Sequence, residues 1–187
     1  MEKHKCSWCL GDALYEQYHD TEWGVPVKDD ALLFEFLILE TFQAGLSWIT
    51  ILRKRENFRA AFDQFDYKKI ATYKQDKIDA LIQDSGIIRN KLKIHAAITN
   101  AQAFMKIQQE FGSFSNYLWK FVDGKPIKNK VKNYKDAPPT TALSDAISKD
   151  LKKRGFKFVG STVVYAKMQA VGMVNDHEVD CFRYREV

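Results

Sequence analysis

Apolar residues recur three and four positions apart over most of this chain, a spacing that restricts its architecture more than any other property of the sequence. Residues with this spacing share one face of an α-helix, whereas residues in a strand alternate between faces. Alternation is confined to short runs such as residues 156–164. The pattern therefore predicts an all-α fold, with helices at residues 30–44, 47–62, 67–74, 77–83, 89–111, 113–121, 144–154 and 160–171.

The chain is large and apolar enough to build a core. Its 187 residues are 45% hydrophobic and 13% aromatic, which is typical of a globular protein with one large domain or two closely packed lobes. Residues 123–141 differ, because they contain Pro126, Pro138 and Pro139, many lysines and little apolar periodicity. We expect an extended loop there, as an excursion within one fold, and assign it no role.

The charge balance and the absence of long apolar stretches limit the partners. Lys and Arg number 29 against 24 acidic residues, for a formal charge of +5. This is compatible with nucleic acid, although the lysine-rich patches at residues 128–132 and 149–157 are equally typical of solvated faces. The N-terminus has no apolar segment, and no stretch approaches the roughly 18 apolar residues of a membrane span. We expect a cytoplasmic protein with no membrane partner.

Cysteine and histidine residues near the two ends of the chain have the spacing of metal ligands. His177 and Cys181 lie four residues apart, and Cys6 and His19 supply a second pair near the N-terminus. Together they would complete a tetrahedral Cys2His2 set that joins the termini. An odd number of cysteines argues against a disulfide framework and favours metal ligation or burial.

Other interpretations of these residues stay open at this point. Cys6 and Cys9 form a C-x-x-C pair, typical of redox and zinc-knuckle units, in which case His177 and Cys181 would be ordinary semi-buried residues. The remaining histidines, His4 and His95, have no comparable partners in the sequence.

An acidic residue stands on the apolar face of the helix expected at 30–44. Glu40 lies three, four and seven residues beyond Leu37, Phe36 and Leu33. An isolated carboxyl group on such a face either pairs with a cation or marks a ligand pocket. The alternative is that Glu40 lies at the solvated end of this helix, shortly before Gly45.

Aromatic residues are concentrated on both sides of this helix in the sequence: Trp8, Tyr15, Tyr18 and Trp23 before it, and Trp48 after it. Core packing would explain most of them. A carboxyl group beside tyrosine hydroxyls and indole faces is also typical of a pocket that stacks on a flat heterocycle and hydrogen-bonds its edge.

Residues 77–100 have the pattern of a helix-hairpin-helix, with a tight turn at Gly86. In that motif the backbone N–H groups of the turn, here Gly86 and Ile87, bind a DNA phosphate without contacting bases. Lys91 and Lys93 would add positive charge at the same place. Any helix-glycine-helix connection looks similar, so the motif alone is moderately specific.

Several of these features together resemble one family, the bacterial 3-methyladenine DNA glycosylase I family of the helix-hairpin-helix DNA glycosylase superfamily. The resemblance covers nearly the whole chain. Its motifs lie at residues 6–8, 15, 18–26, 40, 43–48, 84–89, 152–160, 174–177 and 181. Cys9 is extra relative to the family pattern.

The resemblance implies a fold and a set of site residues. It implies one all-helical, two-lobed glycosylase domain over residues 1–187, with structural zinc held by Cys6, His19, His177 and Cys181 as a staple formed by residues 6–19 and 177–181. Glu40 and Tyr18 would hydrogen-bond a base flipped out of the duplex, Trp48 would stack on it, and Trp8 and Tyr15 would wall the pocket. Glu40 would also be the catalytic residue, through electrostatic assistance. Gly45 and Leu46 would fill the gap left in the DNA.

The resemblance also implies a reaction, the hydrolysis of the N-glycosidic bond of 3-methyladenine in alkylated double-stranded DNA, with the free base as product. This is a step of base excision repair. Asn90 stands where an amine nucleophile would begin the second hairpin helix, so we expect a monofunctional enzyme with no lyase step, although Lys91 is adjacent. We also expect the enzyme to be a monomer. The alternatives are a zinc-stapled DNA damage-binding module without catalysis and a hydrolase of free nucleosides.

Overall fold

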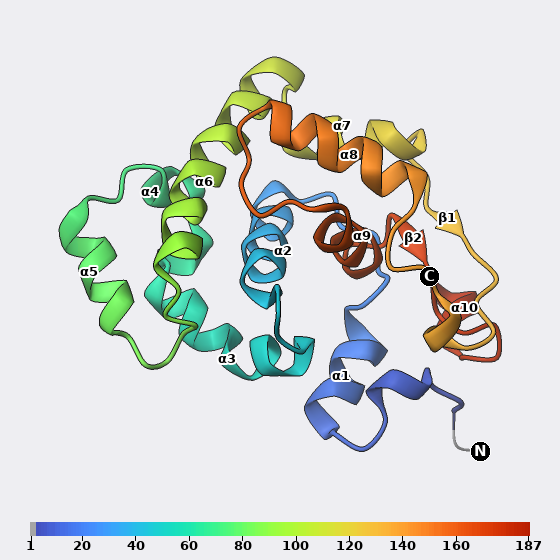
Figure 1. Cartoon of the computed structure of the whole chain (residues 1–187). Helices are drawn as coiled ribbons and strands as arrows, with labels where there is room; N and C mark the ends of the chain where they lie inside the picture. Colours follow the sequence, from blue (N-terminus) through green and yellow to red (C-terminus); the bar gives the residue numbers. More distant parts are fainter. Residues whose placement is uncertain (1–2) are drawn as a thin grey trace.

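The computed structural model describes residues 3–187 and consists mostly of helices (Figure 1). The α-helices are α1 (Ala13–Thr21), α2 (Asp30–Gln43), α3 (Trp48–Ala61), α4 (Tyr67–Ile70), α5 (Gln75–Gln83), α6 (Lys91–Phe111), α7 (Phe114–Trp119), α8 (Ala142–Lys153), α9 (Ser161–Ala170) and α10 (Arg183–Glu186). Short 3-10 helices occupy Ser7–Cys9, Asp63–Phe65, Lys120–Val122 and Tyr134–Asp136. The all-α prediction is confirmed.

Two short strands depart from that prediction. β1 (Ile127–Lys128) and β2 (Val174–Asn175) pair in parallel, with Ile127 opposite Val174. β1 and the 3-10 turn at Tyr134–Asp136 lie within the segment predicted to be an irregular loop. The strand-like alternation at residues 156–164 was misleading, because α9 begins at Ser161 and no strand forms in that run of described residues.

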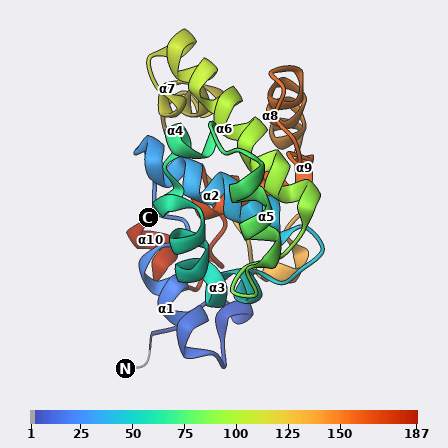
Figure 2. The same ribbon diagram turned by 90° about the vertical axis from the view of Figure 1, so that its left-hand side faces the viewer.

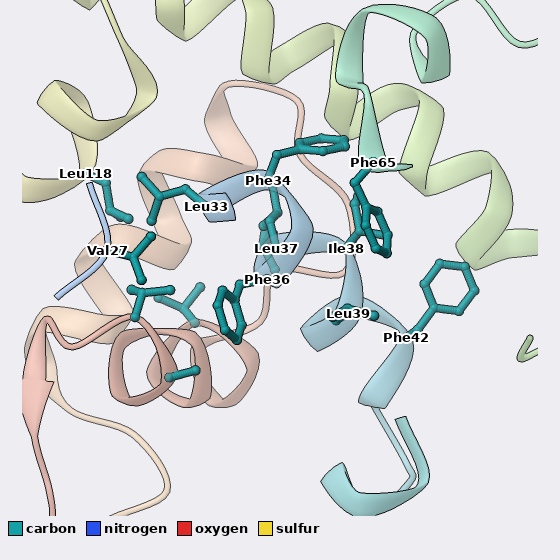
Figure 3. Packing of buried hydrophobic residues seen from close by; sticks show 14 of the residues in the cluster. Val27, Leu33, Phe34, Phe36, Leu37, Ile38, Leu39, Phe42, Phe65 and Leu118 are labelled. Carbon is teal, nitrogen blue, oxygen red and sulfur yellow. The ribbon is translucent and has the colours of Figure 1, made fainter. Parts of the chain in front are cut away.

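Helix α2 lies at the centre of the molecule and packs against α3, α6, α7 and α9 (Figure 1). Its residues 33–42 are all buried, as expected of a helix that is apolar on every side. Figure 3 shows its side chains reaching in several directions, with Leu33 near Leu118 on one side and Ile38 near Phe65 on the other. Glu40 is therefore carried by the most enclosed helix of the fold.

Side-chain hydrogen bonds hold both ends of α2. At the start, the Asp29 carboxylate accepts a hydrogen bond from Leu32 N at 2.8 Å, and Asp30 accepts from Phe114 N at 2.9 Å and Ser115 N at 2.8 Å. At the end, the Lys93 ammonium group donates to the carbonyl oxygens of Phe42 at 3.0 Å and Ala44 at 2.8 Å. These bonds satisfy backbone groups that a helix end leaves open, and they fix α2 in position.

The remaining helices lie around α2. In Figure 1, α4, α5 and α6 lie to the left of α2, α7 and α8 lie above it, and α9, α10 and both chain termini lie to its right; Figure 2 shows α4, α5 and α6 from the front. Near those termini Phe182 N donates to the carbonyl oxygen of His4 at 2.9 Å. Among residues 3–187, none of the helices has both the length and the apolarity to cross a bilayer.

Candidate functional site

A cavity of about 300 Å³ opens where α1, α2, α3 and α9 converge with the segment between β1 and α8. Aromatic rings and polar side chains share its wall, a combination that suits a single flat, polar ligand. The lining residues are Trp8, Tyr15, Tyr18, Trp23, Glu40, Gln43, Ser47, Trp48, Tyr134, Ala166 and Gln169. Folding brings together Glu40, Tyr18, Trp48, Trp8 and Tyr15, the residues that the sequence assigned to a base pocket.

Glu40 carries the only carboxyl group among the described residues that line this cavity. Glu40 is 3% exposed, so the alternative that it lies at a solvated helix end is wrong. Its Oε2 atom finds no hydrogen-bond partner within residues 3–187. Burial raises the pKa of Glu40 to about 8, against a smaller lowering by the charge of Lys167. The fold thus holds a carboxyl group in an apolar wall without neutralising it by an ion pair.

The aromatic side chains of the cavity present rings and open donors to the same space. Trp48, the first residue of α3, is 8% exposed, and its ring lies 5.6 Å from that of Tyr18 at an angle of 45°. Tyr18 OH and the indole N–H groups of Trp8 and Trp48 have no partner in the described part of the chain. Burial raises the pKa of Tyr18 well above its usual value, so its hydroxyl group stays a donor.

Polar residues that the sequence analysis did not select complete the cavity. Tyr134 OH donates to Gln169 Oε1 at 3.3 Å, and Gln169 Nε2 donates to the buried Asp176 carboxylate at 2.8 Å. The segment of residues 123–141, to which no role was assigned, therefore supplies one wall. A lone tyrosine among lysines and a glutamine near the end of a mixed helix were the available signals, and both are weak.

Beside the cavity, Cys6, His19, His177 and Cys181 form a buried cluster whose donor atoms all lie within 4.8 Å of one another. Cys6 Sγ is 3.5 Å from His177 Nδ1, and Cys181 Sγ is 3.4 Å from His19 Nε2 and 3.8 Å from His177 Nδ1. Sulfur and nitrogen ligands at zinc's usual bond lengths and tetrahedral angle are separated by roughly 3.6 Å. The residues fit a four-coordinate metal ion.

The surroundings of the cluster also suit a metal. His19 Nδ1 lies 2.8 Å from Asp20 Oδ1 and His177 Nε2 lies 3.1 Å from the Trp23 carbonyl oxygen, so each ring can donate outward while its other nitrogen faces the cluster. Without a cation the two thiols share one proton: hydrogen bonding to Cys181, with burial, raises the pKa of Cys6, while hydrogen bonding from Cys6 lowers that of Cys181. A bound cation would let both sulfurs ionise.

Cys9 does not belong to this cluster. Its thiol donates to the Cys6 carbonyl oxygen at 3.1 Å, and the four donors that converge in the described chain exclude it. The converging set therefore favours the four-ligand interpretation over a C-x-x-C unit formed by Cys6 and Cys9.

The turn between α2 and α3 lies at the mouth of the cavity, between Gln43 and Ser47, which both line it. Gly45 adopts a φ of +85°, which favours glycine, and the turn is closed by Leu46 N donating to the Gln43 carbonyl oxygen at 2.6 Å. The Leu46 side chain is 41% exposed. An apolar side chain is thus presented to solvent next to the pocket.

The predicted hairpin forms, with α5 and α6 joined by the turn that contains Gly86 and Ile87. Gly86 N donates to Asp84 Oδ1 at 2.7 Å, and Lys54 Nζ donates to the carbonyl oxygens of Ser85 and Gly86 at 3.3 Å, so internal bonds shape the turn. Ile87 N also donates internally, to the Asp84 carbonyl oxygen at 3.5 Å. These contacts occupy the N–H groups that the sequence assigned to a phosphate.

The two lysines predicted at the hairpin have different surroundings. Lys91 is exposed at the start of α6. Lys93 is 6% exposed, and its ammonium group is engaged with the end of α2 as described above. The expected DNA contact of Lys93 is therefore wrong: the positive charge interacts with helix carbonyl groups and does not reach the surface.

Comparisons with known proteins agree with this geometry. A family model described as methyladenine glycosylase matches residues 8–184. DNA-3-methyladenine glycosylase 1 of Escherichia coli (strain K12) is 50% identical over 180 residues, which are 96% of each chain. A crystal structure of 3-methyladenine DNA glycosylase I has a TM-score of 0.93 at 50% identity and covers 96% of this chain and 98% of that one.

A further structure concerns the basis of 3-methyladenine recognition by 3-methyladenine DNA glycosylase I from Staphylococcus aureus. It has a TM-score of 0.92 at 38% identity and covers 95% of both chains. The likeness extends over almost the whole of every chain compared. This chain therefore belongs to the methyladenine glycosylase family.

Proposed function

We propose that this chain is a monofunctional DNA glycosylase that hydrolyses the bond between 3-methyladenine and its deoxyribose in alkylated duplex DNA. The observation that carries the proposal is the buried carboxyl group of Glu40 in the aromatic wall of a cavity of about 300 Å³. Membership of the family supports it, since relatives across the length of the chain are named for this activity.

The charge of the damaged base explains why a carboxyl group belongs in this wall. Methylation at N3 makes the adenine ring cationic, and an ionised Glu40 attracts that charge and accepts an N–H group of the base. Neutral adenine gains much less from the same carboxylate while incurring the same cost of unstacking. Glu40 would thus select the methylated base as the nucleotide turns out of the duplex.

The rings of the cavity would hold the base in place. Trp48 offers a face for stacking and for a cation–π contact, worth about 2 kcal/mol when water is excluded. Tyr18 OH can donate to a ring nitrogen, and Trp8 and Tyr15 close the side of the pocket. These roles follow from the positions of the side chains in the cavity wall and from the chemistry of a flat cation.

The chemical step needs little help from the protein, because the positive charge already makes the base a good leaving group. The C1′–N9 bond breaks, its electron pair neutralises the base, and water adds to C1′ with release of one proton. Since the base loses its charge as the bond breaks, Glu40 contributes mainly to capture and selection of the base. Asn90 caps α6 through Lys93 N at 3.1 Å, so the start of that helix carries an amide where a lyase needs an amine.

Leu46 and the hairpin are proposed to contact the DNA. The exposed Leu46 at the mouth of the cavity can enter the stack where the nucleotide leaves it, with Gly45 allowing the turn to approach the duplex. Lys91 and the turn at Gly86 and Ile87 would lie against a phosphate of the backbone. Because Asp84 and Lys54 already bond within the turn, Lys91 is expected to provide more of this contact than the N–H groups do.

The Cys6, His19, His177 and Cys181 cluster is proposed to hold zinc. Two cysteine and two histidine ligands form a closed tetrahedral set of the kind that structural zinc occupies. The metal would join residues 6–19 to residues 177–181, and so complete one glycosylase domain over residues 1–187. Three buried cysteines without a disulfide and a DNA substrate favour action in the cytoplasm, and we propose that the enzyme works as a monomer.

The proposal is tested by chromatography of the bases released from methylated duplex DNA and from the methylated nucleoside. The wild-type protein should release 3-methyladenine from the duplex, little or none from the nucleoside, and no unmodified adenine. Tight binding to damaged duplex without release would favour a damage-binding module, and equal release from the nucleoside would favour a nucleoside hydrolase. A covalent adduct trapped with borohydride would overturn the monofunctional assignment.

A further inference from the structure

Helix α9 carries a buried lysine that the proposed reaction does not use. Lys167 is 4% exposed, and its Nζ atom has no hydrogen-bond partner among the residues described. The ammonium group lies 4.6 Å from the centre of the Phe114 ring. An amine buried in this way loses hydration without gaining a direct ion pair, so its position needs another explanation.

Glu40 lies between the base cavity and the space in front of Lys167. Besides the cavity of about 300 Å³, Glu40 lines a second cavity of about 10 Å³, which is close to the room that one water molecule needs. Lys167 lines this second cavity, and the other residues of its wall are apolar. Glu40 thus lines both the base site and a small cavity that it shares with a buried lysine.

The other ionisable groups near this pair do not replace either member. Tyr18, Tyr15 and Tyr134 face Glu40 from the base cavity, and burial raises the pKa of each of them, which keeps them neutral. On the side of Lys167, the charge of Asp30 acts on the lysine less than that of Glu40 does, and the Asp30 carboxylate accepts hydrogen bonds from Phe114 N and Ser115 N. Within the described chain, the cation that acts on Glu40 is Lys167.

The two groups ionise over the same range of pH. Burial lowers the pKa of Lys167 to about 7 and raises that of Glu40 to about 8, and each opposes the shift of the other by its charge. One proton can therefore move from the Glu40 carboxyl group to Lys167 Nζ with no change in their summed charge. The transfer turns a neutral pair into a carboxylate that faces the base site and an ammonium group behind it.

We propose that Lys167 is a positioning residue that acts through Glu40: from the small cavity that both residues line, its charge favours the anionic form of Glu40 while the base cavity receives a cationic base. This inference rests on the proposed function for its consequence in catalysis, whereas the coupling between Lys167 and Glu40 is a property of the protein alone. It assigns to α9 a part in selecting the charged base, although the lysine does not touch the substrate.

The first test compares kcat/KM for 3-methyladenine release by the wild type and Lys167→Met between pH 6 and pH 9.5. Without the ammonium group, Glu40 should ionise about one pH unit higher. The variant should therefore lose about tenfold at pH 7 and approach the wild type at the alkaline end. Met168→Leu, which alters packing in the same small cavity without changing charge, should keep the wild-type pH profile.

A purely structural role for Lys167 gives a different result. Lys167→Met would then lower kcat/KM by the same factor at every pH and would lower Tm, whereas we expect Tm to stay equal or rise because a buried unpaired amine is removed. A pH profile that coincides with that of the wild type overturns the inference. A wild-type protein that releases no base at any pH overturns the proposed function instead.

A second measurement needs no activity and does not depend on the folding of the lysine variant. The titration of the Lys167 Cε carbon is followed by NMR in the wild type and in Glu40→Gln, an isosteric change on the other partner. Loss of the carboxylate should lower the pKa of Lys167. The change should be about as large as the change in the pKa of Glu40 expected from Lys167→Met. An unchanged midpoint would show that the two groups are not coupled and would contradict the inference.

Discussion

Glu40 puts a carboxyl group at a place where the requirements of folding alone favour an apolar side chain. The residue lies in the helix that forms the centre of the core, and burial raises its pKa to about 8. A buried acid of this kind reduces stability, because the unfolded chain ionises it more readily. Such a loss of stability is common at sites where a ligand is bound.

Replacement of Glu40 by Gln should therefore stabilise the protein at high pH. The unfolded chain releases the proton near pH 4.5 and the native state near pH 8, so the native state loses stability as the pH rises through this window. Glu40→Gln removes this loss, and at pH 8 its free energy of unfolding should exceed that of the wild type by roughly 4 kcal/mol. Below pH 4.5 the two proteins should differ little.

Denaturant unfolding at pH 4 and pH 8 measures this difference directly. Thr41→Ser, a mild change at the next buried position of α2, serves as the matched control and should alter stability equally at both pH values. If the stability difference between Glu40→Gln and the wild type is the same at both pH values, the assigned pKa of Glu40 is wrong.

At the scale of elements, the terminal segments depend on the Cys2His2 cluster. The segment before α2 buries few large apolar side chains, and η1 (Ser7–Cys9) and α10 are too short to be stable alone. The cluster joins both ends of the chain through four buried side chains. Metal binding should therefore be linked to the folding of these segments.

Removal of the metal should lower Tm and destabilise the chain termini first. With metal at about a hundredfold over its dissociation constant, the loss corresponds to about 3 kcal/mol. Thermal unfolding with and without a chelator measures it in the wild type, in Cys181→Ser and in Cys9→Ser. The wild type and Cys9→Ser should respond to the chelator, whereas Cys181→Ser should already be destabilised and should respond little. A response of Cys9→Ser like that of Cys181→Ser would place Cys9 among the ligands.

The turn between α2 and α3 should act on DNA and not on folding. Leu46→Ala should reduce kcat/KM for damaged duplex about tenfold, because the side chain that fills the gap in the stack is shortened. Its Tm should stay unchanged, since Leu46 is exposed. Ile127→Ala, a similar truncation of an exposed residue on β1, is the control and should retain full activity. Equal losses in the two variants would remove Leu46 from the DNA contact.

Elements with an apolar face could be predicted from the sequence, including the short helices α4, α5 and α7, whereas α1 and the two strands could not. Helices α2, α3, α6, α8 and α9 bury apolar residues at regular spacing, so each lies close to its expected range. Helix α1 buries only Tyr18 and His19, and its polar residues hide its periodicity. β1 and β2 have two residues each, which is too few for any pattern to be recognised.

For the whole molecule, the site depends on contacts between residues that are far apart in sequence. Spacing alone could place Glu40 on an apolar helix face, but it could not bring Tyr134, Ala166 and Gln169 to the same cavity. Those residues meet Glu40 because α9 packs on α2 and because β1 pairs with β2. The resemblance to a family located the pocket and the metal ligands that spacing left open.

The wrong expectation for Lys93 has the same origin. In the sequence Lys93 is one of two lysines that follow a hairpin turn, and nothing there shows that the end of α2 lies against α6. In the fold its ammonium group finds two carbonyl oxygens at that end and becomes a support for the turn at Gly45. Lysines near a DNA-binding motif can therefore be predicted as a group, but their individual roles depend on tertiary contacts.

The central claim is that a buried carboxyl group captures a cationic base, and kcat/KM for 3-methyladenine release by the wild type and Glu40→Gln at pH 8 tests it most directly. The amide is isosteric but has no charge, so the variant should lose one charge-assisted hydrogen bond and roughly thirtyfold or more in kcat/KM. If Glu40→Gln is correctly folded and releases the base within twofold of the wild-type value, the claim is contradicted.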